Sequence, residues 1–94
     1  MAPNLPPSVY EIKVGNPSEL LRRNQTESLD KLWEWITRYR TREGVTEILV
    51  TRQEPEVVGQ KGPISIVALG APTVMLALQR QSEDSPWNEL TPGL

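Results

Sequence analysis

The 94-residue sequence contains no cysteine, no histidine and no phenylalanine. The absence of cysteine excludes disulfide scaffolds, thiol nucleophiles and thiolate metal sites, and the absence of histidine excludes imidazole ligands and imidazole bases. Glu54 and Glu56 could form a carboxylate pair, but nothing near them in the sequence supplies a pocket or a partner charge. Phosphate-binding glycine loops and nucleophile elbows are also missing. We therefore predict a protein that is not an enzyme and that holds no cofactor and no metal.

Neither sign of charge is in large excess. Ten Lys and Arg residues stand against twelve Asp and Glu residues, so the net charge is −2. Because non-specific nucleic-acid binding grows with the number of phosphates neutralised, this balance disfavours it. A chain of this length forms one domain, which buries only about 60–65% of the surface exposed by its unfolded chain. A symmetric dimer would bury more apolar surface, so we expect a homodimer.

Long hydrophobic runs are absent as well. The longest stretch without a charged residue, 62–79, is interrupted by Pro63, Gly70 and Pro72. It therefore does not predict a membrane span.

The ends of the chain are polar or rich in proline. Residues 1–8 lack the positive charge and the apolar run of a secretory signal, and they include a PxxP pattern from Pro3 to Pro6. We expect a disordered arm over residues 1–8, one globular domain over 9–81 and a flexible tail over 82–94. With no signal and no cysteine, a cytoplasmic location is the default expectation.

Three strands are predicted from hydrophobic patterning. Residues 9–14 alternate, with Tyr10, Ile12 and Val14 on one face. Residues 45–52 are rich in branched side chains, and residues 64–69 are apolar enough to form a central strand that is buried on both faces.

Between these strands the sequence predicts irregular structure and a short helix. Asn16 and Pro17 are suited to cap and begin that helix. Residues 53–62 are interpreted as a loop, in which Gly59 and Gly62 would act as hinges of a hairpin turn.

The strongest helix signal covers residues 27–43. Thr26 or Ser28 would cap this helix and Gly44 would stop it. One apolar stripe at i, i+3, i+4 and i+7 is predicted to face the core, and it consists of Leu29, Leu32, Trp33 and Ile36.

Residues 73–81 are ambiguous. Pro72 could open a helix of good helix formers, whereas Thr73 and Val74 could begin a strand paired with 64–69 across residues 70–72. We favour the helix. The resulting order β-α-β-β-α predicts an α+β, two-layer domain with one long amphipathic helix on a largely antiparallel sheet.

A second row on the long helix is the candidate binding site. Its members alternate aromatic rings and guanidinium groups, with two further arginines upstream: Trp35, Arg38, Tyr39, Arg42, Arg22 and Arg23. Such a row suits a protein-binding hot spot or stacking and phosphate contact, although the rings could also widen the core stripe under the arginine stems.

We therefore expect a non-catalytic protein–protein interaction module that acts as an adaptor, assembly factor or regulator. Two alternatives stay open. One is a nucleic-acid-binding protein that uses the same helix face, and the other is a lipid or small-ligand carrier with an apolar cavity behind residues 74–78.

Overall fold

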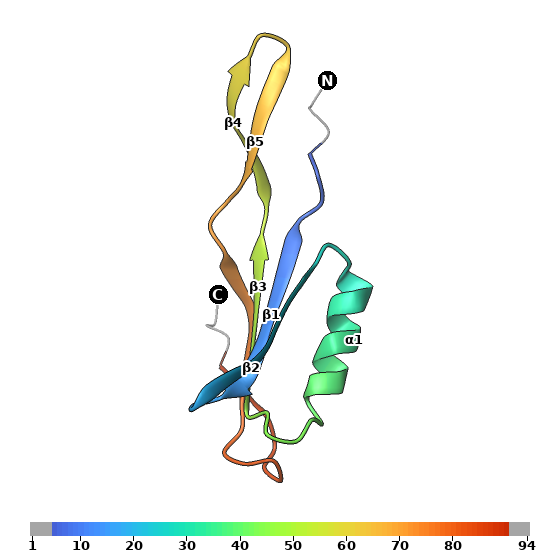
Figure 1. The fold of residues 1–94 in the computed structure, drawn as a ribbon, viewed down its shortest axis with the longest axis vertical. Helices are drawn as coiled ribbons and strands as arrows, with labels where there is room; N and C mark the ends of the chain where they lie inside the picture. Colours follow the sequence, from blue (N-terminus) through green and yellow to red (C-terminus); the bar gives the residue numbers. More distant parts are fainter. Residues whose placement is uncertain (1–4, 91–94) are drawn as a thin grey trace.

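The computed structural model describes residues 5–90. In this part of the chain 52% of the residues lie in strands and 13% in one short helix, so the predicted β-α-β-β-α domain with a long helix is wrong. The elements, labelled in Figure 1, are β1 (Val9–Asn16), β2 (Glu19–Thr26), α1 (Leu29–Tyr39), β3 (Glu47–Gln53), β4 (Pro55–Lys61), β5 (Ile64–Leu69), β6 (Thr73–Gln79) and β7 (Asn88–Glu89).

Five strands form one antiparallel sheet in the order β2-β1-β3-β6-β7. β4 and β5 pair only with each other and continue the course of β3 and β6 beyond the end of the sheet (Figure 1). We call residues 55–69 the β4–β5 hairpin. Its base is closed by a hydrogen bond of 2.8 Å from the Gly70 amide to the Glu54 carbonyl. The hairpin makes the molecule long, with extents of 57 × 24 × 22 Å.

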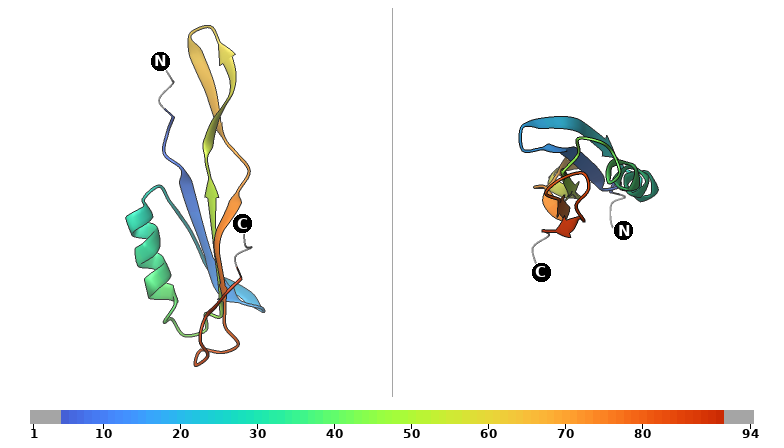
Figure 2. Two further views of the ribbon diagram at one scale, coloured as in Figure 1. Left: turned by 180° about the vertical axis from the view of Figure 1, so that it is seen from behind. Right: turned by 90° about the horizontal axis from the view of Figure 1, so that it is seen from below.

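The core lies between one face of the sheet and α1, which packs on that face alone (Figure 2). The predicted alternation in β1 is confirmed, because Tyr10, Ile12 and Val14 are buried. They pack with the buried residues of the helix and of β3 and its preceding loop: Leu32, Ile36, Tyr39, Val45, Ile48 and Val50. All of these core residues lie within the first 53 residues of the chain. They belong to β1, α1 and β3, except for Val45, which lies just before β3.

The helix is shorter than predicted. Ser28 is its N-cap, as one of the two predicted options, and its hydroxyl accepts a hydrogen bond of 3.2 Å from the Lys31 amide. The helix ends at Tyr39, because the chain then turns and its carbonyls bind the C-terminal segment. The Trp87 indole donates to the Arg40 carbonyl at 2.9 Å, and the Arg80 guanidinium donates to the Arg42 carbonyl at 3.2 Å.

The buried face of α1 is rotated from the predicted stripe. Leu32 and Ile36 are buried as expected, but Leu29 is 46% exposed and Trp33 is 54% exposed. The packed side chains at i, i+3, i+4 and i+7 are instead Leu32, Trp35, Ile36 and Tyr39. The predicted and the observed stripes share Leu32 and Ile36 and have the same spacing. The spacing of apolar residues therefore could not show which of the two faces the core.

No short helix follows Asn16. The Asn16 carboxamide oxygen accepts hydrogen bonds from the Ser18 and Glu19 amides at 2.9 and 3.1 Å, which makes a tight turn from β1 into β2. Asparagine followed by proline suits both a helix start and such a turn. Here, pairing of β2 with β1 determines the outcome.

Three further predictions from the second half are wrong. Residues 53–62 are mostly the strand β4 rather than a loop, and β5 is exposed rather than central and buried. Residues 73–79 form the strand β6, which pairs with β3 and not with β5. Gly62, with φ of +61°, does turn the hairpin, as the hinge interpretation expected.

The described part of the segment expected to be a flexible tail returns to the sheet. The Arg80 guanidinium is buried, donates to the carbonyls of Val45 and Glu83, and lies 4.5 Å from the centre of the Trp87 ring. β7 then pairs with the end of β6. Residues 91–94, and residues 1–4 of the expected N-terminal arm with its Pro3, lie outside the described residues.

The rotated helix face gives a first prediction. Leu32→Ala and Ile36→Ala should each lower the free energy of unfolding by about 2–5 kcal/mol, because each leaves a cavity in the core. Leu29→Ala and Trp33→Ala should each cost about 1 kcal/mol or less, as exposed positions do. Urea unfolding measures all four. Equal costs for the two pairs would contradict the packing described here.

A second prediction concerns the β4–β5 hairpin, which contributes none of the buried core residues. Replacing residues 55–69 by a two-residue turn between Glu54 and Gly70 should leave a folded protein with cooperative urea unfolding. The free energy of unfolding of the monomer should change by less than about 2 kcal/mol, because an isolated two-stranded hairpin is only marginally stable. Loss of cooperative unfolding would show that the hairpin belongs to the core.

Candidate functional site

The aromatic residues of the predicted site belong to the core. Tyr39 is buried, and its hydroxyl accepts a hydrogen bond of 3.1 Å from the Asn24 carboxamide of β2. Trp35 is half-buried and packs against the same cluster. The Tyr39 ring is therefore a core residue, and part of the Trp35 side chain is used in packing, as the alternative interpretation of this row expected.

The four arginines of the predicted site do not form one surface. Arg38 pairs with Glu34 at 3.3 Å, and the Arg42 guanidinium lies 5.8 Å from the centre of the Tyr39 ring. Arg22 and Arg23 are neighbours in β2, so their side chains point to opposite faces of the sheet. The structure thus brings Arg42 to Tyr39 and directs Arg23 to the face away from the helix.

That open face carries a cluster of polar residues around Glu11. The Glu11 carboxylate accepts hydrogen bonds from Arg23 at 2.9 Å and Gln25 at 3.0 Å, and Lys13 lies 3.5 Å away. Only 12% of its side chain is exposed. Burial by itself raises the pKa of Glu11, but the hydrogen bonds and the charges of Arg23 and Lys13 outweigh burial and lower that pKa below its ordinary value.

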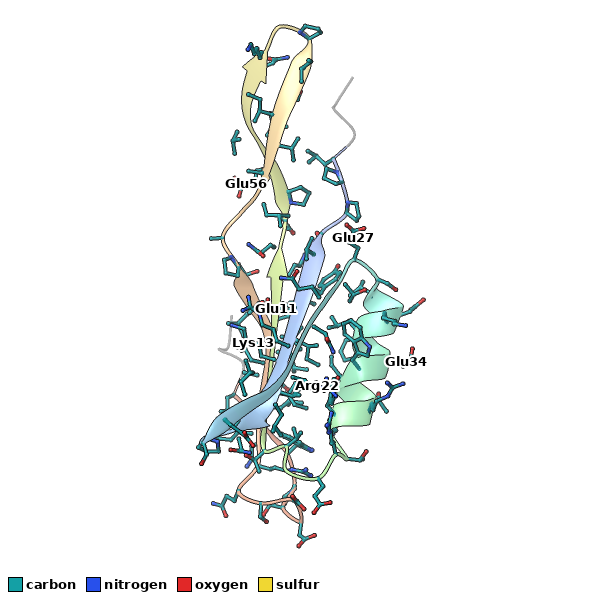
Figure 3. All side chains as sticks on the ribbon, in the orientation of Figure 1. Glu11, Lys13, Arg22, Glu27, Glu34 and Glu56 are labelled. Carbon is teal, nitrogen blue, oxygen red and sulfur yellow. The ribbon has the colours of Figure 1, made fainter. Side chains whose placement is uncertain are left out.

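The β4–β5 hairpin is the most unusual surface of the described residues. Cross-strand partners share a face, so Val57, Val67 and Leu69 lie on one face and Ile64 and Ile66 lie on the other. All of these side chains are exposed, and Ile64 reaches 66%. Val58, at the bulge in β4, is 60% exposed. The hairpin is therefore apolar on both faces, with no element of residues 5–90 covering it (Figure 3).

The edges of the hairpin are also open. Within the described chain β4 and β5 pair only with each other, and β7 covers just the last residues of β6. The free edge made by β5 and β6 coincides with the uncharged run 62–79. Soluble proteins usually protect such edges with charged residues, lysine above all. Sequence reasoning noted this run but interpreted its apolar character as burial in the domain itself.

A second apolar surface lies at the opposite end of the molecule. A hollow of about 350 Å³ is formed by the ends of β1 and β6, the starts of β2 and β3, and Leu90. Lys13, Leu49 and Ala77 are register partners across its floor, on the face away from α1. Leu20 and Leu90 at its rim are both exposed. Glu19 and Glu47 also line it, and neither forms an ion pair with another described residue.

The described residues offer no group of three or more carboxylates placed to hold a metal ion. No helix among residues 5–90 has the length and apolar character needed to cross a membrane. No protein-family model matches the chain, and neither the curated proteins nor the solved structures contain a significant match.

The Glu11 cluster gives a third prediction, on acid stability. Because the pKa of Glu11 is lower in the folded state than in the unfolded chain, its ionised form stabilises the fold above the unfolded-state pKa. This contribution is lost as the pH falls through the folded-state pKa. Glu11→Gln should therefore be less stable than the wild type near pH 7, and the difference should shrink as the pH falls through and below the ordinary glutamate pKa of about 4.3.

Urea unfolding across this pH range measures the effect. Glu43→Gln is the matched control, because Glu43 is exposed and forms no ion pair within residues 5–90. A difference between wild type and Glu11→Gln that stays constant with pH would show that the carboxylate has no such role.

Proposed function

We propose that this chain is a non-catalytic protein–protein interaction module that assembles with copies of itself, and that the β4–β5 hairpin lies inside the resulting interface. The observation that carries the proposal is the hairpin: two strands, apolar on both faces and outside the domain's core. An isolated two-stranded hairpin is at best marginally stable in water. Contacts with another chain would bury the apolar side chains that the hairpin's own domain leaves exposed.

The total surface supports the same conclusion. The chain exposes 6716 Å² and has a radius of gyration of 16.4 Å. A compact monomer of this mass would expose about 5,500 Å², and one of this length would have a radius of gyration of about 12 Å. The chain is therefore extended rather than compact, and the β4–β5 hairpin, which projects beyond the sheet, contributes to the larger exposed surface.

The charges of the hairpin favour other copies of the chain as partners. Between residues 55 and 69 the only charged residues are Glu56 and Lys61, one of each sign. Another copy can therefore approach the hairpin without strong like-charge repulsion, and an apolar surface of that copy would match the hairpin in character. A nucleic acid would find one cation on this surface, which is too few for phosphate binding of useful strength.

The test of this proposal, and our fourth prediction, uses charge placed on the hairpin. Val58→Asp and Ile64→Asp should each weaken self-association at least about tenfold, because a carboxylate would be buried without a partner. Both positions are exposed in the monomer, so circular dichroism should show an unchanged fold. Analytical ultracentrifugation over a wide concentration range measures the association.

The matched control is Leu29→Asp. It changes an exposed leucine to aspartate at the first position of α1, where a carboxylate suits the helix dipole. This variant should associate like the wild type. A wild-type protein that stays monomeric at every concentration overturns the proposal. Hairpin variants that associate as strongly as the wild type would exclude the hairpin as the interface.

A further inference from the structure

We infer that the copies join head to tail, with the tip of the β4–β5 hairpin of one copy seated in the hollow at the opposite end of the next. This inference rests on the proposed function, because it requires self-association through the hairpin. Beyond the proposed function, it identifies the hollow as the surface that binds the hairpin tip. It also replaces the expected symmetric dimer by a repeating contact.

The first argument is that the hairpin is apolar on both faces. In a two-fold symmetric dimer, each copy buries the same patch against its mate. A symmetric contact made through one face of the hairpin would leave its other face in water. A head-to-tail arrangement would instead place the tip between the walls of a concave site, where side chains on both faces of the tip can be covered.

The second argument is the match between the tip and the hollow. The tip consists of the turn at Gly62 and Pro63 with Lys61 and Ile64 beside it. Ile64 is the most exposed large hydrophobic residue of the hairpin. The hollow offers an apolar lining with the exposed Leu20 and Leu90 at its rim. Its volume lies in the range of about 300–1,000 Å³ that is usual for concave binding sites.

The third argument is charge. Lys61 is the only cation between Arg52 and Arg80, and it forms no ion pair with another described residue. The hollow is lined by two carboxylates, Glu19 and Glu47, that also have no cationic partner within residues 5–90. Its one lining cation, Lys13, lies 3.5 Å from the Glu11 carboxylate, which offsets its charge. A cationic tip and an acidic rim fix the orientation of docking as well as attracting one another.

The two surfaces cannot meet within one chain. The hairpin and the turn from β1 to β2 lie at opposite ends of the molecule (Figure 1), whose longest extent is 57 Å. Contact between unlike surfaces of identical chains repeats from copy to copy, and it generates a ring if the rotation closes or a filament if it does not.

The experiment uses the absence of cysteine from the chain, which makes single cysteine variants clean probes. Pro63→Cys marks the tip, and Ser18→Cys marks the turn beside the hollow. A mixture of the two variants, treated with a short bismaleimide, should give a cross-linked dimer. Each variant alone should give none. A mixture of Pro63→Cys with Lys31→Cys, an exposed position on α1, is the control and should also give none.

A charge exchange tests whether Lys61 of one copy pairs with Glu19 of the next. Together with the cross-linking, it is our fifth prediction. Lys61→Glu and Glu19→Lys should each weaken self-association by about tenfold or more, since each sets like charges against one another. The two changes together in one chain should restore association to within a few-fold of the wild type. Lys31→Glu makes the same substitution away from both surfaces and should have no effect.

The outcomes separate this inference from the proposed function. A wild type that stays monomeric overturns both. Association that is blocked by Val58→Asp, combined with cross-linking of Pro63→Cys to itself, would show a symmetric tip-to-tip contact and overturn the inference alone. The same conclusion follows if the charge-exchanged double variant associates no better than its two parents.

Discussion

The whole structure depends on one constraint. Within the described residues a single helix of eleven residues, α1, is the one helix available to bury the apolar face of a sheet. One amphipathic helix can bury one face of a few strands, and α1 does this for β1 and β3. The other face of the same strands therefore carries the Glu11 cluster and the hollow. The β4–β5 hairpin extends past the reach of the helix altogether (Figure 1). Its apolar side chains are therefore exposed, and the proposed assembly would cover them with another chain.

Local patterns predicted the elements whose burial comes from their own neighbourhood. The alternation of β1 and the period of α1 both reflect contact with the domain's core, and both were predicted from the sequence with errors only at the ends and in the rotation of the helix. β5 shows why the same reasoning failed elsewhere. An apolar strand has the same composition whether its own domain or a neighbouring chain covers it. The sequence could indicate that residues 64–69 need burial, but not which molecule provides it.

Other errors arose where pairing between distant segments overrides local preference. Residues 73–79 are good helix formers, yet β6 pairs with β3, more than twenty residues earlier in the chain. Asn16 and Pro17 satisfy a helix start, yet the pairing of β2 with β1 makes them a turn. The two rings of the candidate site pack towards the core, as the open alternative for that row expected, for a related reason. Trp35 and Tyr39 lie beside the predicted core stripe on the helix surface. Which of the two stripes is buried depends on the side of the helix that packs against the sheet.

The uncharged run 62–79 connects the fold to the proposed assembly. In a monomer, a free strand edge without lysine or glutamate, next to apolar faces, would be a hazard for uncontrolled aggregation. The only charges of the hairpin lie near its two ends, Glu56 towards the base and Lys61 at the tip. A cation at the tip leaves the apolar faces intact while favouring a neighbour that presents carboxylates, as the hollow does with Glu19 and Glu47. In the proposed assembly, burial of apolar area provides the free energy of association. The few charges select which surface of a neighbouring copy the hairpin binds. Such a division of roles would direct the proposed self-association towards one orientation and disfavour the others.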